Sequence, residues 1–118
     1  MDNAMENCIF CKIARGEIPA EVVWKDEHVL VFKDIHPATP KHFLAIPLEH
    51  IPTVNDADAN NAAILGRLFV AAAETAKKFG FAESGYRCVV NCNRDAGQEL
   101  FHLHMHIMAG KKFGWPPG

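Results

Sequence analysis

Three histidines alternate with large apolar residues in the segment His102-Leu103-His104-Met105-His106-Ile107-Met108. A period of two is typical of a β-strand, because successive side chains on a strand point to opposite faces. On a helix the three imidazoles would spread over about 200° and could not converge on one ligand. The segment therefore predicts a strand with its imidazoles on a solvent-facing, chemically active face and its apolar residues in the core. A neutral imidazole in such a row can attack an electrophile without first losing a proton.

The cysteines fall into two close pairs, Cys8 with Cys11 and Cys88 with Cys92. In a reducing cytosol, close pairing favours metal binding or thiols over a disulfide framework. The Cys-x-x-Cys spacing of the first pair is typical of half of a zinc site or of a redox pair. A redox pair normally follows a sheet strand at a helix N-terminus, and no strand is expected before Cys8. We expect the second pair to lie on one face of a strand as small buried hydrophobic residues.

Composition limits the possible classes of protein. The 118 residues are 49% hydrophobic, which is enough for one domain over residues 1–118 with a real core. A formal net charge of −2 offers no electrostatic footprint for nucleic acid or for an anionic membrane. Residues 1–6 lack the basic-then-apolar pattern of a signal peptide, and no apolar run approaches the ~20 residues of a membrane span. These features predict a soluble cytoplasmic protein.

Hydrophobic periodicity and the positions of Gly and Pro indicate which elements position these side chains. We expect a short helix over 8–15, strands over 22–24, 29–32, 43–46, 86–92 and 102–108, and a proline-rich loop over 34–41. His28 and His36 fall in turns and are expected to face solvent. A further turn contains Gly97, which lets backbone N–H groups approach an oxyanion closely. This order, with short connections, favours an α+β fold with a mostly antiparallel sheet over a doubly wound fold.

One long helix is expected over residues 58–79, with Asp56 or Asp58 as its N-cap and Gly80 at its end. The residues that follow the helical period on its apolar face are Leu65, Leu68, Phe69, Ala72, Ala76 and Phe79. We expect this helix to act as scaffold and to cover one face of the sheet.

The sequence resembles the histidine-triad (HIT) family, in particular its Hint-type nucleotide-binding phosphoramidases. Besides the alternating histidines, the segments that carry the resemblance are Cys8–Ile13, Gly16–Pro19, Asp34–Ile35, His42–Pro47, Gly85–Arg87 and Trp115–Gly118. They follow one another along nearly the whole chain. The resemblance implies an α+β fold with an antiparallel five-stranded sheet, one long helix and a short N-terminal helix. It also implies a homodimer in which the sheets of two subunits are joined.

The resemblance assigns a role to individual residues. His104 matches the nucleophile that attacks the α-phosphorus of a nucleoside monophosphate ester or amide, and His42 matches a histidine in its proton network. His106 and Asn91 match groups that hold the phosphate, aided by the Gly97 backbone. The remaining matches are Asp34 for the ribose, Phe10, Ile13, Phe32 and Ile35 for the purine slot, and Trp115 for a C-terminal residue that reaches the partner's active site.

Two positions depart from the family pattern. Glu99 stands where some relatives have a serine near the leaving group, so the group that protonates the leaving amine is open. Ala96 replaces a glycine beside Gly97, which would narrow the phosphate loop slightly. We include Glu99 among the expected catalytic and nucleotide-binding residues because it lies just before the triad strand.

The resemblance also bears on the first cysteine pair. Some HIT relatives that keep both cysteines complete a Cys2His2 site with a histidine after the third strand and with the first triad histidine. The corresponding residues here are His50 and His102, which implies a tetrahedral Zn²⁺ on Cys8, Cys11, His50 and His102. The alternative is a pair of inert thiols.

The function that the resemblance implies is hydrolysis of purine nucleoside phosphoramidates, of the AMP-amine type, through a covalent nucleotidyl-histidine. No organic cofactor is expected. Two alternatives are a dinucleoside polyphosphate hydrolase and a nucleotide-binding or regulatory interaction module with incidental turnover. The set of His104, His106, Asn91 and Gly97 favours the enzyme, since binding alone needs no nucleophile.

Overall fold

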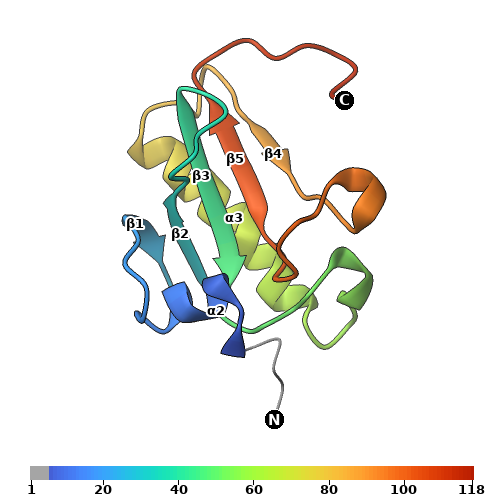
Figure 1. The fold of residues 1–118 in the computed structure, drawn as a ribbon. Helices are drawn as coiled ribbons and strands as arrows, with labels where there is room; N and C mark the ends of the chain where they lie inside the picture. Colours follow the sequence, from blue (N-terminus) through green and yellow to red (C-terminus); the bar gives the residue numbers. More distant parts are fainter. Residues whose placement is uncertain (1–5) are drawn as a thin grey trace.

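The structure is a computed structural model that describes residues 6–118. Residues 1–5 of the expected domain lie outside the described part, as does most of the segment 1–6 that lacks a signal-peptide pattern. Residues 6–118 contain one antiparallel sheet in the order β1-β2-β3-β5-β4 (Figure 1). Its strands are β1 (Val22–Lys25), β2 (Val29–Lys33), β3 (Lys41–Pro47), β4 (Arg87–Val89) and β5 (Met105–Ala109). The α+β fold predicted from the sequence is confirmed.

A helix lies against each face of the sheet. The long helix α3 (Ala62–Lys78) crosses behind the sheet in Figure 1, and the short helix α2 (Ile9–Ala14) lies against the front. Strand alternation divides the core accordingly. In β2, Val29 and Val31 belong to the cluster under α3, whereas Leu30 and Phe32 belong to the cluster under α2. No helix within residues 6–118 is long and apolar enough to cross a membrane.

The long helix starts later than expected and buries a narrower face. The Asp58 side chain accepts the N–H groups of Asn60 and Asn61 at 2.8 and 3.2 Å, which forms a turn ahead of the helix. Neither predicted aspartate is therefore the N-cap, which is Asn61. Phe69 is 65% exposed, so its assignment to the core face was wrong. A helix turns by about 100° per residue, and Phe69 lies at the edge of the stripe on which Leu68 and Ala72 are buried.

The strand over the histidine segment is also shorter than predicted, because β5 begins at Met105. The Leu103 N–H donates to the Ile51 carbonyl at 2.7 Å, so the backbone before β5 pairs with the loop after β3. His102 is fully buried, and the prediction that all three imidazoles share a solvent-facing surface is wrong for it. His104 and His106 are both partly exposed, with ring centroids 5.1 Å apart.

The fourth strand ends at Val89 rather than at residue 92, since its pairing with β5 covers only Arg87–Val89. Cys92 thus lies beyond the strand and is half-buried. Cys88 packs against the larger core, and burial raises the pKa of its thiol. Cys88 is itself only partly buried, so the prediction of two small buried hydrophobic residues on one strand face is wrong for both cysteines.

Candidate active site

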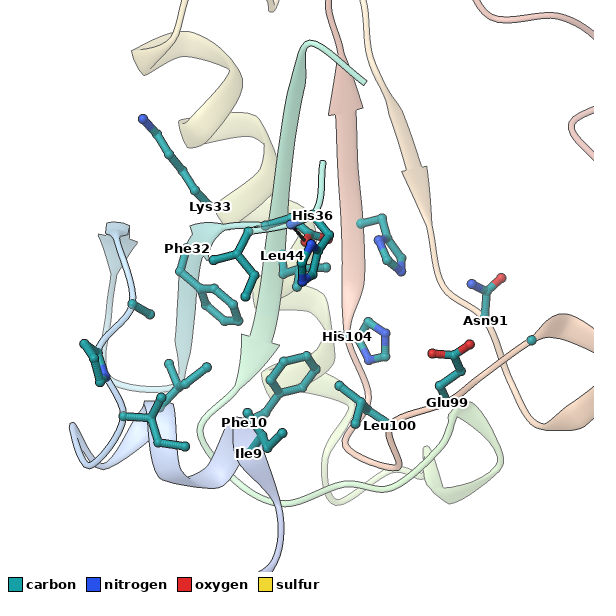
Figure 2. Close-up of a pocket in the computed structure, with 18 residues that line it drawn as sticks. Ile9, Phe10, Phe32, Lys33, His36, Leu44, Asn91, Glu99, Leu100 and His104 are labelled. Atoms are coloured by element: carbon teal, nitrogen blue, oxygen red, sulfur yellow. Dashed lines mark hydrogen bonds between the residues drawn. The ribbon is translucent and has the colours of Figure 1, made fainter. Parts of the chain in front are cut away.

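A cavity of about 600 Å³ opens on the face of the sheet that carries α2 (Figure 2). Helix α2 and strand β2 form one side, and the loop after β4 and the start of β5 form the other. The cavity brings together ten residues expected to bind the nucleotide: Phe10, Ile13, Phe32, Asp34, Ile35, Asn91, Gly97, Glu99, His104 and His106. Residues distant in sequence therefore form one pocket, with an apolar end and a polar end.

His104 is held with one nitrogen towards the backbone. Its Nδ1 lies 2.9 Å from the carbonyl oxygen of His102, and a carbonyl only accepts, so we assign the ring proton to Nδ1. The Nε2 lone pair is consequently bare. The Phe10 ring meets the imidazole edge to face at a centroid distance of 5.2 Å and restricts its rotation. With the proton on Nδ1, the ring is held so that the Nε2 lone pair can attack an electrophile.

His42 and His106 form a chain of directed hydrogen bonds behind the pocket wall. The Ala38 N–H donates to His42 Nδ1 at 2.9 Å, so the proton of neutral His42 sits on Nε2. That Nε2–H donates to His106 Nδ1 at 2.9 Å. The proton of His106 is thereby placed on its own Nε2. The Ala38 N–H thus determines that His106, which lines the pocket, presents a hydrogen-bond donor to it.

His42 and His106 are both neutral at pH 7. Burial, with smaller contributions from His104 and His42, lowers the pKa of His106 to about 4 against an opposing effect of Asp34. Burial also lowers the pKa of His42, although the Asp34 carboxylate opposes the shift. Asp34 Oδ2 lies 3.4 Å from His42 Nε2, and Asp34 Oδ1 accepts the His36 N–H at 2.8 Å.

The polar end of the cavity is built on the turn between β4 and β5. Gly97 adopts φ +81°, a left-handed conformation that side chains disfavour. Its N–H donates to the Arg94 carbonyl at 3.0 Å, so the backbone donor expected for the phosphate is already used within the turn. The buried Gln98 accepts the Asn93 N–H at 2.8 Å and donates to the carbonyls of Pro52 and Leu100 at 2.9 and 3.0 Å. Gln98 therefore ties this turn to the loop that follows β3. Sequence reasoning missed Gln98, because only its distant partners reveal its role.

Further lining residues were also missed: Ile9, Ile18, Leu44 and Leu100, with His36 at the pocket wall. For Ile9 a signal existed, because it lies one helical turn before Ile13 on the same face of α2. His36 is exposed as predicted, but it also lines the pocket. Trp115 is 85% exposed and lies in the C-terminal tail, which Arg87 holds by donating to the Gly114 carbonyl at 2.8 Å.

Beside the pocket, the four expected metal ligands form a second cluster. The donor atoms of Cys8, Cys11, His50 and His102 all lie within 4.8 Å of one another. His102 Nε2 lies 2.7 Å from the Pro47 carbonyl and so carries the proton, which leaves Nδ1 bare. That Nδ1 lies 3.2 Å from Cys8 Sγ, and His50 Nδ1 lies 3.2 Å from Cys11 Sγ. Burial lowers the pKa of His102 to about 4, so this ring is neutral at pH 7.

Another group of close donor atoms, those of Asp34, His42 and His106, is less suited to a metal. A metal on His42 Nε2 would force the ring proton onto Nδ1, where it would face the Ala38 N–H. The Cys/His cluster has no such conflict at His102, because the Pro47 carbonyl holds the proton on the opposite side of the ring. The structure therefore supports a metal-binding group of two thiols and two imidazoles, and a proton-bearing chain beside it.

Fold and pocket together define an antiparallel α+β protein with His104 and His106 at one end of a pocket. The sequence profile of the HIT domain matches residues 15–113. The chain belongs to the HIT family.

Individual relatives agree with this assignment. The chain is 48% identical to the purine nucleoside phosphoramidase of Escherichia coli (strain K12) over 109 residues, 92% of each chain. A crystal structure of a HIT family hydrolase from Legionella pneumophila is similar with a TM-score of 0.91 at 46% identity, covering 95% of this chain and 100% of that one. For a histidine triad protein from Clostridium difficile the TM-score is 0.88 at 44% identity, with 92% and 94% coverage.

Proposed function

We propose that this protein hydrolyses the P–N bond of purine nucleoside phosphoramidates, of the AMP-amine type. The observation that carries the proposal is the bare Nε2 of His104 in a pocket whose other polar groups, from His106 and Asn91, suit a phosphate. The name of the Escherichia coli relative supports the same substrate class.

The proposed reaction proceeds in two displacements. In the first, the His104 Nε2 lone pair attacks the α-phosphorus, the P–N bond of the substrate breaks, and its electron pair leaves with the amine, which takes up a proton. In the second, water attacks the phosphorus, the P–Nε2 bond breaks, and the electron pair returns to His104 while water loses a proton. The His102 carbonyl stabilises the charge that develops on the imidazole, because it accepts from Nδ1–H throughout.

The other side chains bind and orient the nucleotide in this proposal. His106 donates from Nε2 to a phosphate oxygen, and the Asn91 side-chain amide adds a further donor. Asp34 accepts from the ribose hydroxyls. The purine lies between the apolar side chains of the other end, namely Phe10, Ile13, Phe32 and Ile35. Ile35 is 84% exposed, and covering it would contribute apolar burial on binding.

A turnover screen tests the proposed substrate class. AMP and GMP amides of simple amines would be compared with dinucleoside polyphosphates at equal concentration, with release of the nucleoside monophosphate as the measurement. We expect turnover of the amides to exceed that of the dinucleotides. Faster turnover of the dinucleotides would favour the alternative hydrolase, and binding without turnover of either class would favour the interaction module.

We further propose that Glu99 delivers the proton to the departing amine and recovers it from the attacking water. Glu99 lines the polar end of the cavity together with His104, and it is exposed, so it can exchange protons with solvent. Replacing Glu99 by Gln should lower kcat/KM for the AMP amide of a basic alkylamine on the order of 10²-fold, the lower end of general acid catalysis. An AMP anilide with electron-withdrawing substituents should be affected far less. Equal losses for both substrates would contradict this role.

The neutral state of His106 has a consequence for stability. Its pKa is about 4 in the fold against 6.5 for a free imidazole, so the unfolded chain binds more protons between these values. The free energy of unfolding should therefore be fully developed above pH 6.5 and fall as the pH drops towards 4, by on the order of 2 kcal/mol from this residue. Its immediate titratable neighbours are Asp34, His42 and His104.

Urea unfolding at pH 7 and pH 4.5, at one protein concentration, measures this effect. His106→Asn removes the titrating group, so the variant should lose less stability over this interval than the wild type. His102 titrates in both proteins and cancels in the comparison, because His106 is not among the groups that shift its pKa. An equal loss in both proteins would show that His106 is not held neutral by the fold.

We propose that the Cys/His cluster holds a structural Zn²⁺. The donor set of two thiolates and two imidazoles is one that zinc prefers, and the bare Nδ1 of His102 suits metal coordination. The Cys11 N–H donates to Cys8 Sγ at 3.3 Å, which helps to stabilise sulfur charge in the site. The ion would join α2 to the loop after β3 and to the segment before β5. It would thereby hold Phe10 against His104.

We also propose a homodimer, in which Trp115 reaches the partner's pocket. Three exposed features support it: the edge strand β4, the apolar side chains of Phe69 and Val70 on α3, and the tail around Trp115. Light scattering at micromolar concentration should give a mass near twice 13.1 kDa. A mass near that of one chain would contradict the dimer.

A further inference from the structure

A second, smaller cavity adjoins the polar end of the main pocket. Its volume is about 180 Å³, compared with about 600 Å³ for the main pocket. It shares four lining residues with the main pocket, namely Ile9, Phe10, Glu99 and Leu100. Figure 2 places Glu99 and Leu100 beside His104, with Phe32 farther off in the apolar half. The second cavity therefore borders the region where the phosphate would lie.

The walls of this cavity are mainly apolar. Phe101 lines it and is 50% exposed, and the shared residues Ile9 and Leu100 are also exposed at its rim. Cys8 and His50, both in the Cys/His cluster, contribute to the lining as well. Glu99 is the acidic group at the border between the two cavities. An occupant would thus meet mainly hydrophobic side chains, with Asn7, His50 and Glu99 as polar neighbours.

We propose that this cavity is the subsite for the leaving amine, and that it selects amines with an uncharged, apolar substituent of a few carbon atoms. The inference depends on the proposed function. In a nucleoside phosphoramidate the α-phosphorus carries the ribose oxygen on one side and the amine nitrogen on another. The nucleoside fills the apolar half of the main pocket in the proposed binding mode. The space that continues from Glu99 and Leu100 is then available to the amine substituent. Because the walls are mainly apolar, an amine that carries a carboxylate would lose part of its hydration there and is disfavoured.

Three AMP amides test the proposal: those of methylamine, of 3-methylbutylamine and of 4-aminobutyrate. The first two amines differ mainly in apolar length, so a difference between their amides reports burial rather than leaving-group chemistry. Partial burial of four additional carbons should raise kcat/KM about 10–30-fold for the 3-methylbutylamide, mainly through a lower KM. The 4-aminobutyrate conjugate should fall at least ~10-fold below the 3-methylbutylamide.

Two variants test whether Phe101 is responsible for the preference for the longer alkylamide. Phe101→Ser should bring the ratio of kcat/KM for the two alkylamides to within about threefold of one, because it removes an apolar wall. Val54→Ser changes another exposed apolar residue, in the 3₁₀ turn Val54–Asp56, and should keep the wild-type ratio. A ratio near one in the wild type, or an undiminished ratio in a folded Phe101→Ser protein, would overturn the subsite.

A binding measurement separates this inference from the proposed function. Calorimetric titration of the His104→Asn protein with the two alkylamides reports their affinities without turnover. Tighter binding of the 3-methylbutylamide would support the subsite even if the wild type hydrolysed neither amide, which would refute only the proposed function. Equal affinities would overturn the subsite even if both amides were hydrolysed.

Discussion

Replacing His104 by Asn is expected to lower turnover of an AMP amide by at least ~10³-fold, while the fold and nucleotide binding persist. Asparagine keeps a polar side chain at the pocket wall, but it has no nitrogen lone pair that can attack phosphorus. Without the covalent route, water must displace the amine directly. The apolar side chains on the α3 face of β5, Met105 and Ile107, are untouched, so thermal unfolding should change little.

Trapping the intermediate tests the same claim directly. Rapid acid-free quenching of the wild type during turnover should give a mass increase of one nucleoside monophosphate, mapped by proteolysis to His104. Replacement of His106 or Asn91 should cost less, about 10–10³-fold, since each removes one of several phosphate contacts. An adduct on another residue, or turnover of the His104→Asn protein within tenfold of wild type, would refute the nucleophile assignment.

Among the changes considered, loss of the proposed zinc ion should destabilise the folded protein most. Protein purified without chelator is expected to contain about one equivalent of zinc per chain. Its removal should lower the thermal unfolding midpoint by on the order of 10 °C, because the ion binds only the folded arrangement of ligands from three separate segments. Replacing Cys11 by Ser should have a similar effect, since it removes a buried ligand.

Cys92→Ser provides the matched control, because Cys92 is half-buried and lies outside the cluster. It should leave both the zinc content and the unfolding midpoint close to those of the wild type. Elemental analysis that finds less than about a tenth of an equivalent of zinc per chain would exclude the site. The cluster would then consist of thiols and imidazoles joined by hydrogen bonds alone.

The local pattern of the sequence determined which side chains share a face. Alternation places Met105, Ile107 and Ala109 in the core under α3, as expected of a strand with period two. Periodicity similarly indicated the long helix, and glycine indicated its end, where Gly80 adopts φ +78°. Such features depend on neighbours within a few residues, so the amino-acid order alone specifies them. The resemblance to relatives then indicated the pocket residues that no local pattern would reveal.

Tertiary structure decided the features that depend on distant partners. Cys8 and His102 are 94 residues apart in sequence, and only the packing of α2 beside the start of β5 brings them together. The start of β5 at Met105 and the exposure of Phe69 were likewise set by which segments lie alongside. The tautomers of the reactive histidines are the clearest case. The proton of His104 follows the His102 carbonyl, and that of His42 follows the Ala38 N–H, because a hydrogen-bond partner at one ring nitrogen determines what the other nitrogen can do.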